Sequence, residues 1–154
     1  MTNLRYFVIY SYVFKLCSFT KENIVPDITS VLLVDDDLAF LTQLKILFQR
    51  AGYKVAATTS PIAALYSLDT FRPDIIITDF LMPEMRGDVL AEKIKERNLL
   101  KPFVIIMTTP GIVPGNHKAN GMIDKDALLA LLHYEEQVDE LPPEEDDSED
   151  EEEK

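Results

Sequence analysis

The chain has 154 residues, 47% of them apolar, a formal net charge of −12 at pH 7 and a single cysteine, Cys17. This length fits one domain of ordinary size, and the apolar content is sufficient for a hydrophobic core. One cysteine excludes an internal disulfide framework and a thiolate metal site, and it is consistent with a reducing, cytoplasmic environment.

The negative charge is concentrated at the C-terminal end. Residues 135–154 contain 13 of the 27 acidic residues and one of the 15 basic residues, which leaves 14 of each elsewhere. We expect residues 139–154 to form an acidic disordered tail, because such a run cannot bury a core. Neither part has the basic stripe that contacts with nucleic-acid phosphates require, so no nucleic-acid partner is expected.

The first 29 residues differ in pattern from the rest. An aromatic and β-branched run over residues 6–19 is interrupted by Lys15. The run is too short and too polar for a membrane span, which needs about 20 apolar residues. It also lacks the small-residue cleavage site of a signal peptide. We therefore interpret residues 1–29 as an N-terminal extension and predict no membrane span.

From Ser30 onward, apolar runs typical of buried parallel strands alternate with helical periodicity. The predicted strands cover residues 31–34, 53–58, 75–78, 103–107 and 121–124. The predicted helices run from residue 38 to a stop at Gly52, and over residues 61–69, 87–98 and 127–138. Ser60 is the expected N-cap of the second helix, and Asp126 that of the last.

This alternation predicts an α/β fold with a doubly wound, five-stranded parallel sheet in the flavodoxin-like order 2-1-3-4-5. The stretch from Thr109 to Gly121 contains Pro110, Gly111, Pro114 and Gly115, and proline and glycine at this density oppose an ordinary helix. We therefore expect the fourth helix of the fold, which this stretch would provide, to be shortened or irregular. The domain is predicted to cover residues 30–138.

Polar residues follow four of the predicted strands, and the carboxyl ends of parallel strands lie at one edge of a sheet. They are the aspartates at 35–37, Asp79, the threonines at 108–109, and Lys125. Converging carboxylates repel each other and must take up protons or bind a cation, and oxygen ligands favour Mg²⁺. Such a site suits phosphoryl transfer to a carboxylate, which would give an aspartyl-phosphate.

Four motifs, in this order along the chain, resemble the receiver domains of two-component response regulators. They are Val31-Leu-Leu-Val-Asp-Asp-Asp37, Asp79-Phe-Leu-Met-Pro-Glu-Met-Arg-Gly87, Met107-Thr108-Thr109 and Gly121-Met-Ile-Asp-Lys125. The resemblance covers about residues 30–138. The loop that begins at Asp79 resembles the phosphoacceptor loop of the family and is the most specific of the four motifs.

The resemblance implies that Asp79 accepts a phosphoryl group from a histidine kinase, a phosphotransfer protein or a small phosphodonor. It also implies a Mg²⁺ site. In that site Asp36 and Asp79 would bind the ion directly, and Asp35 would act largely through a bound water. The backbone carbonyl of Leu81 would complete the protein ligands.

Three further residues have expected roles. By the resemblance, Lys125 would contact the phosphoryl group, and Thr108 would move toward it and signal its presence to the opposite face. Thr109 is the alternative to Thr108. Asp37 directly precedes the apolar stripe of the first helix, so we expect it to be a helix cap rather than a metal ligand.

The implied function is a cytoplasmic, single-domain response regulator whose phosphorylation changes its binding to a downstream effector protein. It would assist its own phosphorylation and dephosphorylation without being a turnover enzyme. One alternative is a receiver-like module that binds a partner independently of phosphorylation. Another is a Mg²⁺-dependent phosphatase of the haloacid-dehalogenase type, but residues 35–39 lack the threonine of its Asp-x-Asp-x-Thr motif.

Two positions depart from the family pattern. Met122 lies three residues before the lysine, where an aromatic switch residue is usual. Asp126 follows the lysine, where the family usually has a proline, often with a cis peptide. Because a cis bond before a residue other than proline costs about 3 kcal/mol, we expect a trans peptide here. Met122 and the shortened helix region favour the phosphorylation-independent module.

Overall fold

The computed structural model describes residues 28–97, 102–112, 115 and 118–138. The predictions for residues 1–27 and for the acidic tail lie outside this part of the chain. Ile28 and Thr29, assigned above to the extension, belong to the folded body, and Ile28 is buried in the core. In the described ranges, no helix is both long and apolar enough to cross a membrane.

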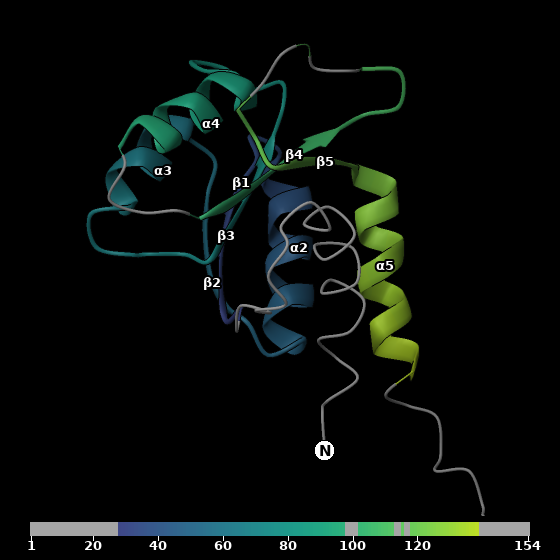
Figure 1. Cartoon of the computed structure of the whole chain (residues 1–154). Coiled ribbons are helices and arrows are strands. Elements are labelled where there is room, and N and C mark those ends of the chain that lie inside the picture. The colour runs from purple at the N-terminus through teal and green to yellow at the C-terminus, as the bar shows by residue number, and fades with distance from the viewer. Residues whose placement is uncertain (1–27, 98–101, 113–114, 116–117, 139–154) are drawn as a thin grey trace, which may run out of the picture.

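Strands and helices alternate along the chain (Figure 1). The strands are β1 (Ser30–Val34), β2 (Lys54–Thr58), β3 (Ile75–Asp79), β4 (Phe103–Thr108) and β5 (Gly121–Asp124). The helices are α2 (Leu38–Arg50), α3 (Pro61–Ser67), α4 (Gly87–Glu96) and α5 (Lys125–Val138).

The strands form one parallel sheet in the order β2-β1-β3-β4-β5, which confirms the predicted topology. Helices α2 and α5 cover one face of the sheet, and α3 and α4 cover the other (Figure 1). Each βαβ connection requires a helix to return over the sheet, and this produces the two helical layers.

Successive residues of the central strands face opposite helical layers. In β1, Leu33 packs with the core under α2 and α5, and Leu32 packs with the core under α3 and α4. Both side chains are almost fully buried, and burying a leucine contributes roughly 1.5–3 kcal/mol to folding. The continuous apolar runs seen in the sequence are therefore explained by a sheet that is covered on both faces.

The helix starts agree with the sequence prediction at two of three caps. Asp37 Oδ1 accepts hydrogen bonds from the N–H groups of Ala39 and Phe40, so Asp37 caps α2 as predicted. Ser60 caps α3 through the Ala63 N–H, with Pro61 as the first helical residue. Both capping side chains satisfy N–H groups that have no partner within the helix.

The prediction for the start of α5 was wrong. The helix begins at Lys125 rather than at residue 127, and Asp124, not Asp126, provides the capping carboxylate. Asp124 Oδ1 lies 2.9 Å from the Asp126 nitrogen and 3.2 Å from the Ala127 nitrogen. The helix therefore starts directly at the end of β5. No cis peptide bond occurs in the described residues, in agreement with the trans peptide expected after Lys125.

The connection between β4 and β5 contains no helix in its described residues, which are 109–112, 115 and 118–120. It begins with a turn, in which the Ile112 N–H donates to the Thr109 carbonyl at 3.1 Å. Gly111 in this turn has a φ of 87°, a conformation that glycine adopts without steric cost. The expectation that an ordinary fourth helix would not form here agrees with this turn.

Asp74 joins the beginnings of β1 and β3. Its Oδ2 accepts hydrogen bonds from the Thr29 N–H at 3.0 Å and hydroxyl at 3.3 Å, and from the Ser30 N–H at 2.9 Å and hydroxyl at 2.7 Å. Burial acts to raise the pKa of Asp74, but these hydrogen bonds outweigh it and lower that pKa. The charged carboxylate therefore stabilises the folded state.

We predict that Asp74→Asn lowers the free energy of unfolding by about 1 kcal/mol at about pH 7, a modest figure because the site is exposed. Since the folded-state pKa is the lower one, the contribution is present above the unfolded-state pKa. The difference should shrink as pH falls below about 4. Urea denaturation measures both the loss of stability and its pH dependence, with Asp69→Asn as the control for an exposed acid. Equal urea midpoints for Asp74→Asn and wild type at neutral pH would contradict this role.

Candidate functional site

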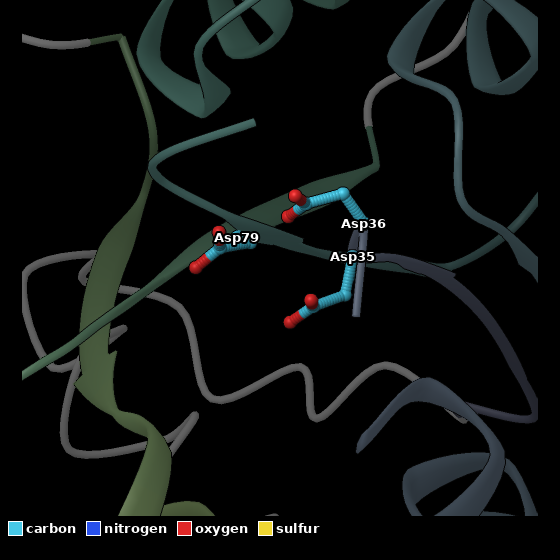
Figure 2. Close-up of side chains that lie close together, drawn as sticks. All are labelled: Asp35, Asp36 and Asp79. Atoms are coloured by element: carbon cyan, nitrogen blue, oxygen red, sulfur yellow. The ribbon is translucent and has the colours of Figure 1, made fainter. Parts of the chain in front are cut away.

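Three carboxylates meet at the carboxyl ends of β1 and β3. Asp35 and Asp36 directly follow β1, and Asp79 is the last residue of β3. Because Val34 is in register with Thr78, these strand ends lie side by side. Figure 2 shows that the three side chains lie close together at these strand ends. One carboxylate oxygen from each lies within 4.8 Å of the others.

Asp35 is completely buried, with a relative exposure of 0%. Its Oδ1 accepts a hydrogen bond from the Asp37 N–H at 2.9 Å. Its Oδ2 forms an ion pair with Lys125 Nζ at 2.7 Å, but no donor in the described residues completes a well-formed hydrogen bond to it. Burial raises the pKa of Asp35 above its ordinary value, and this outweighs the lowering by Lys125 and the Asp37 N–H.

Lys125 bridges two of the acids. As the first residue of α5, it places Nζ 2.7 Å from Asp35 Oδ2 and 3.1 Å from Asp79 Oδ1. Burial acts to lower the pKa of Lys125, but the two carboxylates raise it by more, so the ammonium stays charged near neutral pH. A positive charge is thereby held beside the carboxylate of Asp79.

A cavity of about 70 Å³ lies beside Asp79. Its lining residues are Asp79, Phe80, Leu81, Thr109, Ile112 and Lys125. The cavity includes Leu81, the predicted source of a carbonyl ligand. It includes Thr109 and not Thr108.

Thr108 ends β4 in register with Asp124, half-buried, on the face of the sheet that also carries Met122. Of the two threonines, Thr109 rather than Thr108 lines the cavity beside Asp79. The structure thus brings Asp35, Asp36, Asp79, Leu81 and Lys125 together at one site, and the choice between Thr108 and Thr109 as the phosphoryl contact stays a prediction.

Gly87 has a steric role that the motif alone did not explain. A Cβ at this position would overlap the backbone oxygen of Asp79, and it would lie 3.2 Å from the Phe80 Cα. The Gly87 N–H also donates to the Phe80 carbonyl at 2.9 Å. The start of α4 therefore packs directly against the backbone of Asp79, and only glycine leaves room for this contact.

The sequence analysis missed two residues at the site. Phe40 lies in the first turn of α2, and its ring centroid is 4.7 Å from Lys125 Nζ. No local sequence pattern indicated this contact, because it joins two helices that are far apart in the sequence. Ile112 lines the cavity from the turn after β4, and no local pattern indicated this position.

The buried charge of Asp35 leads to a prediction for protein freed of divalent ions. Because its pKa is raised in the folded state, the ionised form opposes folding, and stability falls as pH rises through that value. We expect Asp35→Asn to have a free energy of unfolding about 1–3 kcal/mol higher than that of the wild type at about pH 7. Lys125 does not lose all compensation in this variant, since Asp79 remains its partner.

The gap between Asp35→Asn and wild type should close toward about pH 4, where Asp35 of the unfolded chain also becomes protonated. Urea denaturation in EDTA measures this dependence. Asp36→Asn removes an exposed charge from the same cluster and serves as the matched control, with little change expected. An Asp35→Asn protein less stable than wild type at neutral pH would refute the argument.

Comparison with known proteins agrees with the site geometry. The family model described as the response regulator receiver domain matches residues 31–130. The chain is 28% identical over 76 residues to the alkaline phosphatase synthesis transcriptional regulatory protein PhoP of Bacillus subtilis, covering 49% of this chain and 32% of PhoP. It is 35% identical over 78 residues to the response regulator SaeR of Staphylococcus aureus, covering 51% of this chain and 34% of SaeR. The matches thus span about a third of the length of these relatives.

Solved structures show the same fold. A protein described as a response regulator from Chloroflexus aurantiacus superposes with a TM-score of 0.63 at 25% identity, covering 73% of this chain and 97% of that one. The chemotaxis response regulator CheY4 of Vibrio cholerae gives a TM-score of 0.55 at 23% identity, with coverages of 70% and 98%. Because the family model matches well over half of the chain, this protein belongs to the response regulator receiver domain family.

Proposed function

We propose that this protein is a Mg²⁺-dependent phosphoacceptor switch of a two-component pathway and that Asp79 receives the phosphoryl group. The observation that carries the proposal is the environment of Asp79. Its carboxylate is largely buried beside a cavity, with Asp35 and Asp36 on one side and the Lys125 ammonium 3.1 Å from Oδ1. These are the charges that phosphoryl transfer to a carboxylate requires.

The donor set fits a hard divalent cation. All available side-chain ligands are carboxylate oxygens, and Asp35 Oδ2 is buried without a well-formed hydrogen bond. Asp36, Asp79 and the backbone carbonyl of Leu81 would hold Mg²⁺ directly, and Asp35 largely through a water. When bound, the ion supplies positive charge that neutralises the oxygens of the transferred group.

The transfer step uses the carboxylate of Asp79 as the nucleophile. One of its oxygens forms a bond to the phosphorus of the donor. The bond from phosphorus to the histidine nitrogen of a kinase or phosphotransfer protein, or to the oxygen of acetyl phosphate, breaks at the same centre. The electron pair of that bond leaves with the donor, and the product is an acyl phosphate.

The residues around Asp79 would stabilise the charge that arrives with the phosphoryl group. Lys125 is close enough to Asp79 to contact a phosphoryl oxygen as a charge-assisted donor. A hydroxyl at the end of β4, from Thr109 or from Thr108, would donate to another oxygen. In this way the protein assists its own phosphorylation and dephosphorylation and does not act as a turnover enzyme.

The readout of the switch would be a change in protein binding. A phosphoryl group on Asp79 adds charge next to the ends of β4 and β5, where Thr108 and Met122 share one face of the sheet. A shift of these residues would alter the surface offered to a downstream effector protein. A cytoplasmic histidine kinase pathway supplies both the phosphodonor and the effector in this scheme.

One alternative has a specific observation in its favour. Met122 replaces the usual aromatic residue, and the described part of the β4–β5 connection contains no helix. A receiver-like module that binds its partner without phosphorylation would be compatible with both features.

We predict that intact-mass measurement after incubation with acetyl phosphate and Mg²⁺ shows a gain of one phosphoryl mass. Asp79→Asn should show none, because it lacks the nucleophilic oxygen, and EDTA should prevent the gain in the wild type. Asp126→Asn, which changes an exposed acid next to Lys125, should behave as the wild type. A folded, Mg²⁺-binding wild type without any gain would support the phosphorylation-independent module instead.

Mg²⁺ should also stabilise the folded protein, because Asp35, Asp36 and Asp79 come together only when the chain is folded. At a free Mg²⁺ concentration of 100 times the Kd, the expected increase in unfolding free energy is about 2.7 kcal/mol. Urea denaturation across a Mg²⁺ series measures it. Asp36→Ala should lose most of the increase, and Glu92→Gln on the exposed side of α4 should keep it. A wild-type midpoint that does not respond to Mg²⁺ would rule out the metal site.

A further inference from the structure

We propose that Phe40 is a positioning residue of the phosphoryl site, whose ring keeps the Lys125 ammonium in place while the charges around it change. The inference rests on the proposed function and adds a residue to it. Lys125 Nζ lies 4.7 Å from the centroid of the Phe40 ring, within the range of a cation–π interaction.

Within the described residues, the Lys125 ammonium has three charged or aromatic contacts. Two are ion pairs, to Asp35 Oδ2 at 2.7 Å and to Asp79 Oδ1 at 3.1 Å, and the third is the ring. The side chain of Lys125 is only 18% exposed, so little water competes for the cation. A cation–π interaction is stronger under such conditions than at an exposed surface.

Phosphorylation changes the first two partners but not the third. The Asp79 oxygen that attacks phosphorus becomes part of the acyl phosphate, and its negative charge is then carried by the phosphoryl oxygens. When Mg²⁺ is bound, Asp35 would also interact with the ion, largely through a water. Phe40 has no charge to lose and binds no metal, so its ring remains available to the ammonium before and after transfer.

A fixed partner matters for lysine because of its flexibility. The side chain has a four-carbon stem, and restricting its rotamers has an entropic cost. A ring on one side of the ammonium limits the positions that it adopts when an ion pair is released. The ammonium is then already located where the phosphoryl oxygens arrive, which lowers the barrier to transfer.

The position of Phe40 is itself coupled to the acidic cluster. Its backbone N–H donates to Asp37 Oδ1 at 3.1 Å, and the Asp37 N–H donates to Asp35 Oδ1 at 2.9 Å. These two hydrogen bonds link the buried acid, the cap of α2 and the residue with the ring. The ring is half-buried and packs against the core under α2 and α5, so it has little freedom to turn away.

The test compares Phe40→Leu, which keeps an apolar side chain without a π face, with Phe40→Tyr, which keeps the face. The measured quantity is the rate constant for phosphorylation by acetyl phosphate at saturating Mg²⁺. Phe40→Leu should lower it by about 2-fold to 30-fold, the range that corresponds to cation–π energies. Phe40→Tyr should stay close to wild type, and the Mg²⁺ affinity should be unchanged in both variants.

A double-mutant cycle separates this role from a purely structural one. In a Lys125→Met background there is no cation to position, so adding Phe40→Leu should have no further effect on the rate. An equal slowing by Phe40→Leu in both backgrounds would overturn the inference, as would a wild-type rate in Phe40→Leu itself. Phe40→Met provides a second variant without a π face if the leucine protein does not fold.

The phosphoacceptor function of Asp79 and the positioning role of Phe40 can be tested separately. A wild-type protein that accepts no phosphoryl group would overturn the proposed function and this inference together. A wild type that is phosphorylated, alongside a Phe40→Leu protein with the same rate, would overturn only the role of Phe40.

Discussion

The arrangement of the site depends on one constraint, which is that Lys125 must reach Asp35 and Asp79 at the same time. A completely buried carboxylate is costly unless a cation compensates it. The compensation here requires three strands to end at the same edge of the sheet, because the acids follow β1 and end β3 while the lysine follows β5. The strand order and register therefore position the residues of the site as well as the core. With three acids and one lysine, the site also keeps an excess of negative charge, which suits a divalent cation.

Much of the fold was predictable because its signals are local. A continuous apolar run marks a strand covered on both faces, and capping residues such as Asp37 and Ser60 act on N–H groups only a few residues away. The acidic run and Asp79 were assigned to one edge because strand polarity fixes where each strand ends. The start of α5 was placed wrongly, since the choice between Asp124 and Asp126 as the cap depends on where β5 leaves its pairing with β4. That is a tertiary property.

The details of the site were harder to predict from the sequence, because they also depend on tertiary structure. Thr108 and Thr109 are adjacent, and a shift of one residue at the end of a strand moves a side chain to the other face of the sheet. Which hydroxyl lines the cavity therefore depends on where β4 ends and the following turn begins. Phe40 reaches Lys125 across 85 positions of sequence, through the packing of α2 beside α5, and no periodicity within α2 carries that information.

The contact between Gly87 and Asp79 also has a mechanical meaning. Where a helix and a strand touch through backbone atoms alone, there is no side chain between them to change rotamer and absorb a displacement. Close-packed protein interiors transmit strain instead of dissipating it. A displacement of the Asp79 backbone would therefore act directly on the first turn of α4, because Gly87 has no side chain that could absorb it.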